Sequence, residues 1–107
     1  MIVGLVQQQN SADTDSNLEK IQRNIRQCAQ RGAELVVLQE LQNSLYFCQT
    51  EDTDTFDLAE PIPGPSTEYF GNITRELGVV LVTTLFERRA PGIYHNTAVV
   101  LEKDGSI

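Results

Sequence analysis

Two side chains that can carry proton-transfer or covalent chemistry stand close together in the stretch E-L-V-V-L-Q-E-L-Q-N-S-L-Y-F-C, residues 34–48. They are Glu40 and Cys48. A carboxylate can serve as a general base, and a thiolate can serve as a nucleophile. The acidic neighbours of the thiol, Glu51 and Asp52, disfavour a thiolate at Cys48. We therefore interpret Cys48 as a packing residue and Glu40 as the better candidate for chemistry.

The position of Glu40 supports a functional role. It follows the apolar run 35–38, which predicts a buried strand, and ligands of open α/β sheets bind beyond the carboxyl ends of strands. Between Leu38 and Leu41 we expect the carboxylate to be partly buried, an environment that suits a general base. The alternative is structural: Glu40 could cap a backbone N–H group or pair with a surface arginine.

The other candidates are weaker. His95 is the single histidine, so any Cys–His or Ser–His pair would have to use it, but a structural hydrogen bond beside Asn96 is the commoner role. Tyr46 and Phe47 could wall a pocket or anchor a loop by packing. Cys28 falls on the apolar stripe of an expected helix, which indicates packing. The sequence has no glycine-rich phosphate-binding pattern and no metal-ligand cluster, so it predicts neither a metal nor a cofactor.

The elements that position Glu40 begin with a strand–helix–strand unit. Residues 2–6 and 35–38 are apolar on both faces, which is typical of strands covered on both sides. Between them, Ser16 and Glu19 form a capping box that opens a helix, and Gly32 can end it. The apolar stripe of this helix is Leu18, Ile21, Ile25, Cys28 and Ala29. Such a unit predicts two parallel strands.

A long loop separates this unit from a second helix. Residues 41–64 lack a sustained periodicity, and long loops in compact domains tend to be functional. Pro65 suits the first turn of the next helix, and Gly78 suits its end. The expected apolar face of this helix is Tyr69, Phe70, Ile73 and Leu77.

Two further strands are expected near the end of the sequence. They cover 79–86 and 97–101, and their connection is too short for a helix, so the pair is predicted to be antiparallel. The run K-D-G-S, residues 103–106, predicts a tight turn that leads into a return strand. The result is an α/β fold with a mixed sheet, and we expect residues 1–107 to be the N-terminal part of a larger domain.

Composition excludes several classes of function. The net charge is −7 with only 8 lysines and arginines, which argues against a nucleic-acid partner. No apolar run reaches the roughly 18–20 residues that a membrane span needs, and the N-terminus lacks the features of a signal peptide. We therefore expect a cytoplasmic protein with no membrane partner and with reduced thiols.

These runs together resemble the nitrilase, or carbon–nitrogen hydrolase, superfamily. The resemblance rests on V-G-L-V-Q, on A-E-L-V-V-L-Q-E-L, on Y-F-C-Q-T-E-D, and on L-F-E-R-R-A-P-G-I-Y-H-N-T-A-V-V-L-E-K-D-G. It covers the whole chain. The last two runs are most similar to N-carbamoylputrescine amidases.

The resemblance implies a nitrilase-like αββα sandwich, two of which usually associate into dimers and larger homo-oligomers, so the chain would supply a mixed sheet with helices on one face. It implies a Glu-Lys-Cys triad in which Glu40 is the base. The lysine and the nucleophilic cysteine would lie beyond residue 107, so they are neither Lys103 nor Cys48. Tyr46 would line the substrate pocket. The implied substrate is a small molecule, with no metal or organic cofactor. Alternatives are an amidase of the β-ureidopropionase or ω-amidase type, or a non-catalytic module.

Overall fold

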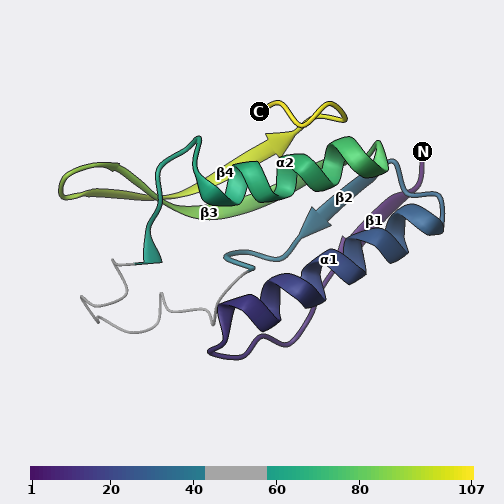
Figure 1. Ribbon diagram of the computed structural model, residues 1–107, viewed down its shortest axis with the longest axis horizontal. Helices are drawn as coiled ribbons and strands as arrows, with labels where there is room; N and C mark the ends of the chain where they lie inside the picture. The colour runs from purple at the N-terminus through teal and green to yellow at the C-terminus, as the bar shows by residue number, and fades with distance from the viewer. Residues whose placement is uncertain (43–57) are drawn as a thin grey trace.

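The computed structural model of the protein describes residues 1–42 and 58–107, and within them the chain forms four strands and two helices (Figure 1). In chain order these are β1 (Val3–Val6), α1 (Thr14–Gln30), β2 (Leu35–Leu38), α2 (Pro65–Leu77), β3 (Val80–Ala90) and β4 (Ile93–Leu101). Every helix and strand expected from the sequence is present, and the differences concern their ends.

The strands form one mixed sheet in the order β1-β2-β3-β4. β1 pairs in parallel with β2, and β2 pairs in parallel with β3, whereas β3 and β4 are antiparallel. The α/β class and the mixed sheet predicted from the sequence are therefore confirmed. Because β1 and β2 are parallel neighbours, their carboxyl ends meet at the same edge of the sheet, where Glu40 follows β2.

Helix α1 begins earlier than the sequence indicated. Its N-cap is Asp13, whose Oδ1 accepts hydrogen bonds from the backbone N–H groups of Asp15 (3.1 Å) and Ser16 (3.3 Å). The predicted capping box of Ser16 and Glu19 is wrong, since Asp13 caps the helix first and leaves Ser16 inside its first turn. The predicted end is confirmed: Gly32 has a left-handed φ of 91° directly after the C-cap Arg31.

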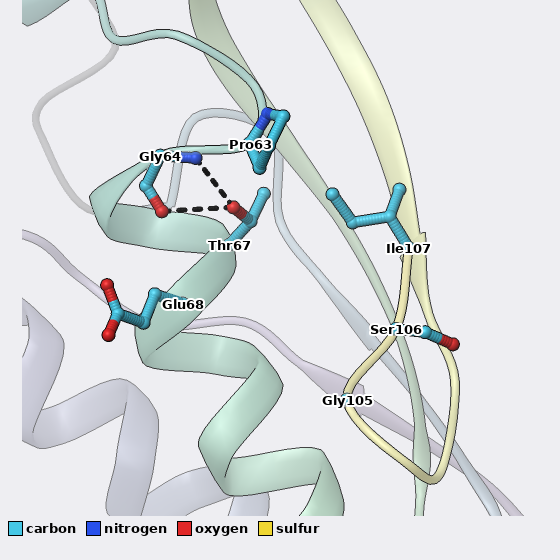
Figure 2. Close-up of a pocket in the computed structure, with 7 residues that line it drawn as sticks. All are labelled: Pro63, Gly64, Thr67, Glu68, Gly105, Ser106 and Ile107. Atoms are coloured by element: carbon cyan, nitrogen blue, oxygen red, sulfur yellow. Dashed lines mark hydrogen bonds between the residues drawn. The ribbon is translucent and has the colours of Figure 1, made fainter.

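Helix α2 has the ends that the sequence indicated. Pro65 is its first residue, and Gly78 ends it with a left-handed φ of 67°. Its N-cap, Gly64, has no side chain, and the hydroxyl of Thr67 in the first turn hydrogen-bonds back to the backbone of Gly64. Thr67 Oγ1 accepts the N–H of Gly64 at 2.8 Å and donates to the carbonyl of Gly64 at 3.0 Å, as Figure 2 shows.

The β3–β4 hairpin is longer than expected. Both strands continue through the predicted connection to a turn at Pro91 and Gly92, where Gly92 has a φ of 77°. Polar residues can occupy this part because the tip of the hairpin extends past the helices (Figure 1). Past β4, the predicted tight turn is confirmed. The Gly105 N–H donates to the Glu102 carbonyl at 2.9 Å, and the Glu102 N–H donates to the Ser106 carbonyl at 2.8 Å.

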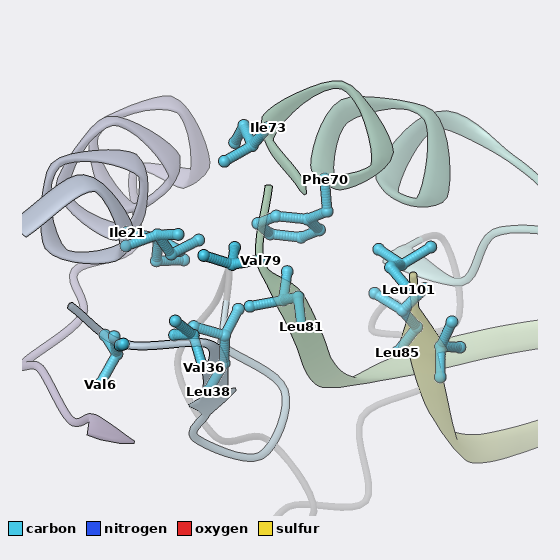
Figure 3. Close-up of a cluster of buried hydrophobic side chains, with 13 residues drawn as sticks. Val6, Ile21, Val36, Leu38, Phe70, Ile73, Val79, Leu81, Leu85 and Leu101 are labelled. Carbon is cyan, nitrogen blue, oxygen red and sulfur yellow. The ribbon is translucent and has the colours of Figure 1, made fainter. Parts of the chain in front are cut away.

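The hydrophobic core lies between the two helices and one face of the sheet (Figure 3). Ile21 and Ile25 of α1 and Phe70 of α2 are fully buried there against Val36 and Leu81 of the sheet. Both predicted helical stripes are confirmed. Ile73 is buried in the same core, and the other members are partly buried against it: Leu18, Cys28, Ala29, Tyr69 and Leu77.

Cys28 is one of those partly buried members. A Cβ atom at Gly4 would lie 2.8 Å from the Sγ of Cys28. The thiol therefore packs directly on the backbone of β1, and its predicted packing role is confirmed.

The opposite face of the sheet, which we call the outer face, carries apolar side chains that the helices do not cover. Val3 and Leu5 of β1 and Val100 of β4 are exposed, Leu5 to 76%. The prediction that the first strand is covered on both faces is therefore wrong for the residues described, because both helices pack on the same side. Within residues 1–42 and 58–107, no helix is long and apolar enough to cross a membrane.

Candidate active site

Glu40 stands at the point where the chain turns away from the end of β2. The next residue, Leu41, has a left-handed φ of 49°, an uncommon conformation for a leucine. Its N–H donates to Thr84 Oγ1 of β3 at 2.8 Å, and its side chain is buried. The anchored backbone and the buried side chain of Leu41 together fix the direction in which Glu40 leaves the strand.

The carboxylate of Glu40 meets a side chain from β4. Asn96 Nδ2 donates a short hydrogen bond to Glu40 Oε1. Asn96 pairs with Phe86 in the hairpin, and strand alternation places both on the outer face with Thr84. Glu40 itself is exposed, so the expected partial burial is wrong: the apolar neighbours Leu38 and Leu41 turn into the core and leave the carboxylate outside.

Side-chain amides hold the chain on both sides of Glu40. Gln39 Oε1 accepts the N–H of Gln8 at 2.7 Å, which ties the end of β2 to the end of β1. Asn10 Nδ2 donates to the carbonyl of Gln42 at 2.7 Å. The loop after β1 therefore fastens the residues before and after Glu40, and a carboxylate held at both flanks is suited to positioned proton transfer.

Two hollows lie near the ends of the elements. One, of about 410 Å³, opens beside the carboxyl ends of β1 and β2 and includes Gln8 and Gln39 in its lining. The other, of about 450 Å³, lies between the start of α2 and the chain end and is shown in Figure 2. Its carboxylate, Glu68, points away from Ile107. Neither lining includes Glu40 or Asn96, and the first hollow lies nearer to Glu40 in the chain because Gln39, the residue before it, is part of that lining.

The structure separates the remaining candidates from this site. Tyr46, Phe47 and Cys48 lie outside the described residues. His95 is exposed on β4 and pairs across the hairpin with Glu87 rather than with a thiol. Within residues 1–42 and 58–107, no group of three or more metal-binding side chains comes together.

Two carboxylates that the sequence analysis passed over make ordered contacts. Glu60 accepts the N–H and the Oγ–H of Ser66 at the start of α2, both at 2.8 Å. Glu87 is buried in β3 and accepts the hydroxyl of Thr97 at 2.7 Å. Glu60 also pairs through its backbone with β3. The Glu60 contacts fasten α2 to the sheet and the Glu87 contact joins β3 to β4, so we interpret both carboxylates as structural.

The perturbed carboxyl groups also lie away from Glu40. Bidentate hydrogen bonds from Arg26 of α1 lower the pKa of Glu76 of α2, with the shorter contact at 2.7 Å. Hydrogen bonds from the side chain and backbone of Ser106 lower the pKa of Asp104. The first pair joins the two helices, and the second closes the turn after β4, so both support the fold rather than a reaction.

Asn96 is the site residue that sequence reasoning missed. Asparagine is depleted in strands, and Asn96 interrupts a stretch of good strand formers, I-Y-H-N-T-A-V-V-L. An asparagine within such a stretch indicates a side chain that makes a specific contact. The signal was hidden because we expected Asn96 in an irregular connection instead of inside β4.

The model of the carbon–nitrogen hydrolase family matches residues 2–107, and the chain belongs to that family. A crystal structure of a carbon–nitrogen hydrolase from Helicobacter pylori G27 superimposes with a TM-score of 0.90 and 38% identity, over 97% of this chain and 36% of that one. The expected nitrilase-type fold is thereby confirmed.

The chain is also similar to curated proteins over most of its own length. The chain is 34% identical over 95 residues to N-carbamoylputrescine amidase of Solanum lycopersicum, which is 88% of this chain and 31% of that protein. It is 32% identical over 106 residues to citrullinase of Francisella tularensis, 98% of this chain and 37% of that protein. The chain thus spans about a third of the length of the curated relatives it matches.

Proposed function

We propose that the protein hydrolyses a non-peptide C–N bond of a small molecule, N-carbamoylputrescine, to putrescine, CO2 and ammonia. The observation that carries the proposal is the placement of Glu40, exposed at the carboxyl end of β2 with its oxygen engaged by Asn96. An accessible carboxylate in fixed orientation can take a proton from an attacking thiol. Similarity to N-carbamoylputrescine amidases supports the choice of N-carbamoylputrescine as the substrate.

The proposed reaction follows the family triad. Glu40 takes the proton of a cysteine thiol, and the thiolate forms a bond to the carbamoyl carbon of the substrate. A lysine stabilises the tetrahedral intermediate, Glu40 returns the proton to the departing nitrogen, and ammonia leaves. Water then hydrolyses the remaining thioester, an S-alkyl thiocarbamate, with the deprotonated Glu40 as base and the cysteine as the leaving group, and the released carbamate loses CO2. The lysine and cysteine are assigned to positions after residue 107, and Tyr46 is assigned to the pocket wall.

The charge of the protein supports a cationic substrate. N-carbamoylputrescine carries a free ammonium group, and a net charge of −7 favours its approach, although such a field acts weakly. Citrulline and β-ureidopropionate share the carbamoyl-amine group, and ω-amides of keto acids offer a related C–N bond. They are the rival substrates, and the relative named citrullinase makes citrulline the specific alternative.

The test is ammonia release by the complete reading frame that contains this sequence. We expect the highest kcat/KM on N-carbamoylputrescine, compared with citrulline, β-ureidopropionate and an ω-amide. Glu40→Gln should lower kcat by about 10²- to 10⁴-fold, the usual contribution of a general base. His95→Ala, an exposed neighbour of the site, is the matched control and should keep the activity. Faster turnover of a rival would overturn the substrate, and an active Glu40→Gln variant would remove Glu40 from the reaction.

A native mass measurement tests the remaining alternative, a non-catalytic module. The printed chain has a mass of 11.9 kDa. A native polypeptide of that mass without activity would support the module. A polypeptide two to three times heavier that contains the lysine and the cysteine supports the enzyme. We further propose a cytoplasmic homo-oligomer that acts in polyamine synthesis, which size-exclusion chromatography and cell fractionation can test.

A further inference from the structure

We propose that Asn96 is a positioning residue that aims the carboxylate of Glu40 at the thiol it deprotonates. This inference rests on the proposed role of Glu40 as the general base. The observation behind it is the hydrogen bond from Asn96 Nδ2 to Glu40 Oε1, which joins residues 56 positions apart in the sequence.

The chemistry of the pair assigns different tasks to the two carboxylate oxygens. The NH2 group of an asparagine can only donate, so Oε1 acts as its acceptor. Among the described residues, this is the one hydrogen bond recorded on the Glu40 side chain. The second oxygen, Oε2, is then free to accept a proton, and rotation of the carboxylate is restricted by the bond at Oε1. A base held in this way meets its proton donor in a defined direction.

Two aromatic residues are the neighbours of Asn96 on the outer face of the hairpin. They are Phe86, which is its partner in the hairpin register, and Tyr94, two residues before it. The rings of Phe86 and Tyr94 lie 5.7 Å apart at an interplanar angle of 37°. Asn96 therefore rises from the strand next to two residues whose rings pack on each other.

A second anchor on the same hairpin acts on the backbone. Thr84 Oγ1 accepts the N–H of Leu41 at 2.8 Å, and Thr84 is two residues before Phe86 on the same face of β3. The hairpin thus holds the residue after Glu40 by its backbone and Glu40 by its carboxylate. With two anchors from one rigid element, the direction of the Glu40 side chain is set by the β3–β4 hairpin as well as by its own strand.

A purely structural hydrogen bond is the competing explanation, and exposure argues against it. Both Glu40 and Asn96 are exposed, so neither side chain fills the core and water can replace either partner. Loss of the bond should therefore leave the fold intact and change only the geometry of the base. We expect Asn96→Ala to lower kcat by about 10- to 100-fold, as misplacement of a catalytic group does, with KM nearly unchanged.

The experiment is a double-mutant cycle in the complete protein, with ammonia release from N-carbamoylputrescine as the assay. Asn96→Ala removes the donor. Asn96→Asp keeps the shape but places an acceptor against Glu40, and Asn96→Gln keeps the carboxamide on a longer side chain. We expect the loss in kcat to be largest for Asn96→Asp and smallest for Asn96→Gln. His95→Ala again serves as the control, and thermal melting of each variant reports on the fold.

The decisive variant combines Glu40→Gln with Asn96→Ala. If Asn96 acts only through Glu40, the double variant is as slow as Glu40→Gln alone. Fully multiplied losses, a change in KM without a change in kcat, or full activity of Asn96→Ala would each overturn the inference while leaving Glu40 in place. A wild type that hydrolyses none of the substrates would overturn the proposed function, and this inference with it.

Discussion

The start of α2 offers a sharp test of how this fold is held together. Glu60 places one carboxylate oxygen on the N–H of Ser66 and the other on its hydroxyl, both at 2.8 Å. Ser66 is buried, and the N-cap of this helix, Gly64, has no side chain to satisfy the free N–H groups. We therefore predict that the carboxylate of Glu60 replaces the missing cap.

The expected magnitude depends on the substitution. In Glu60→Gln the amide can still accept the Ser66 N–H and donate to its hydroxyl, so only the charge is lost. The attraction between a carboxylate and a helix N-terminus contributes about 0.3–1 kcal/mol, and a charged hydrogen bond exceeds a neutral one by about 1 kcal/mol, which gives about 1–2 kcal/mol. Glu60→Ala removes both bonds at a buried partner and should cost about 2–4 kcal/mol.

Urea unfolding followed by circular dichroism measures these differences as changes in the free energy of unfolding. The matched control is Glu68→Gln, which removes an exposed carboxylate from the same helix turn and should cost no more than about 1 kcal/mol. Ser66→Ala should lose most of its effect when Glu60 is already alanine. Equal costs for Glu60→Ala and Glu68→Gln would refute the capping role, because the two hydrogen bonds to Ser66 would then contribute nothing.

Two further predictions concern contacts of α2. Gly71→Ala should destabilise the protein although alanine favours a helix by about 1 kcal/mol, because the new Cβ would lie 2.8 Å from the backbone oxygen of Gly105. Thermal melting measures the effect, with the exposed substitution Asn72→Ala as the control. A melting temperature of Gly71→Ala equal to or above that of the wild type would contradict this close approach. Hydrogen bonds from Arg26 lower the pKa of Glu76, so the ion pair stabilises the fold above the unfolded pKa of about 4.3 and is lost as the pH falls through the lower folded value. The difference in stability between wild type and Glu76→Gln should therefore vanish in acid, and a difference independent of pH would contradict the assignment.

Local signals in the sequence were sufficient for most of the fold. Pro65, Gly78 and Gly32 marked helix ends because the proline ring and the left-handed conformation leave few alternatives. The start of α1 was misjudged because Asp13 and Ser16 are both good N-caps, and three-dimensional packing decides between them. The local sequence cannot distinguish between two candidate N-caps of similar strength.

The candidate site was only half predictable. Glu40 could be found because the end of a buried strand is a local feature of the sequence. Its partner Asn96 could not, because the contact depends on the sheet order and on the exact length of the hairpin. The exposure of Glu40 was also missed, since the left-handed turn at Leu41 determines which side chains enter the core.

The hydrogen bond between Glu40 and Asn96 has a consequence for biosynthesis. Its partners are 56 residues apart, and β3 lies between their strands in the sheet. During synthesis from the N-terminus, β1, α1 and β2 emerge first, but the glutamate cannot be oriented until β4 has left the ribosome and paired with β3. Contacts of such long range form late, because the closure of the intervening chain must come first. A nascent chain that has emerged only as far as α2 would therefore carry Glu40 without the hydrogen bond from Asn96, and the proposed positioning of the carboxylate would begin only with the completed hairpin.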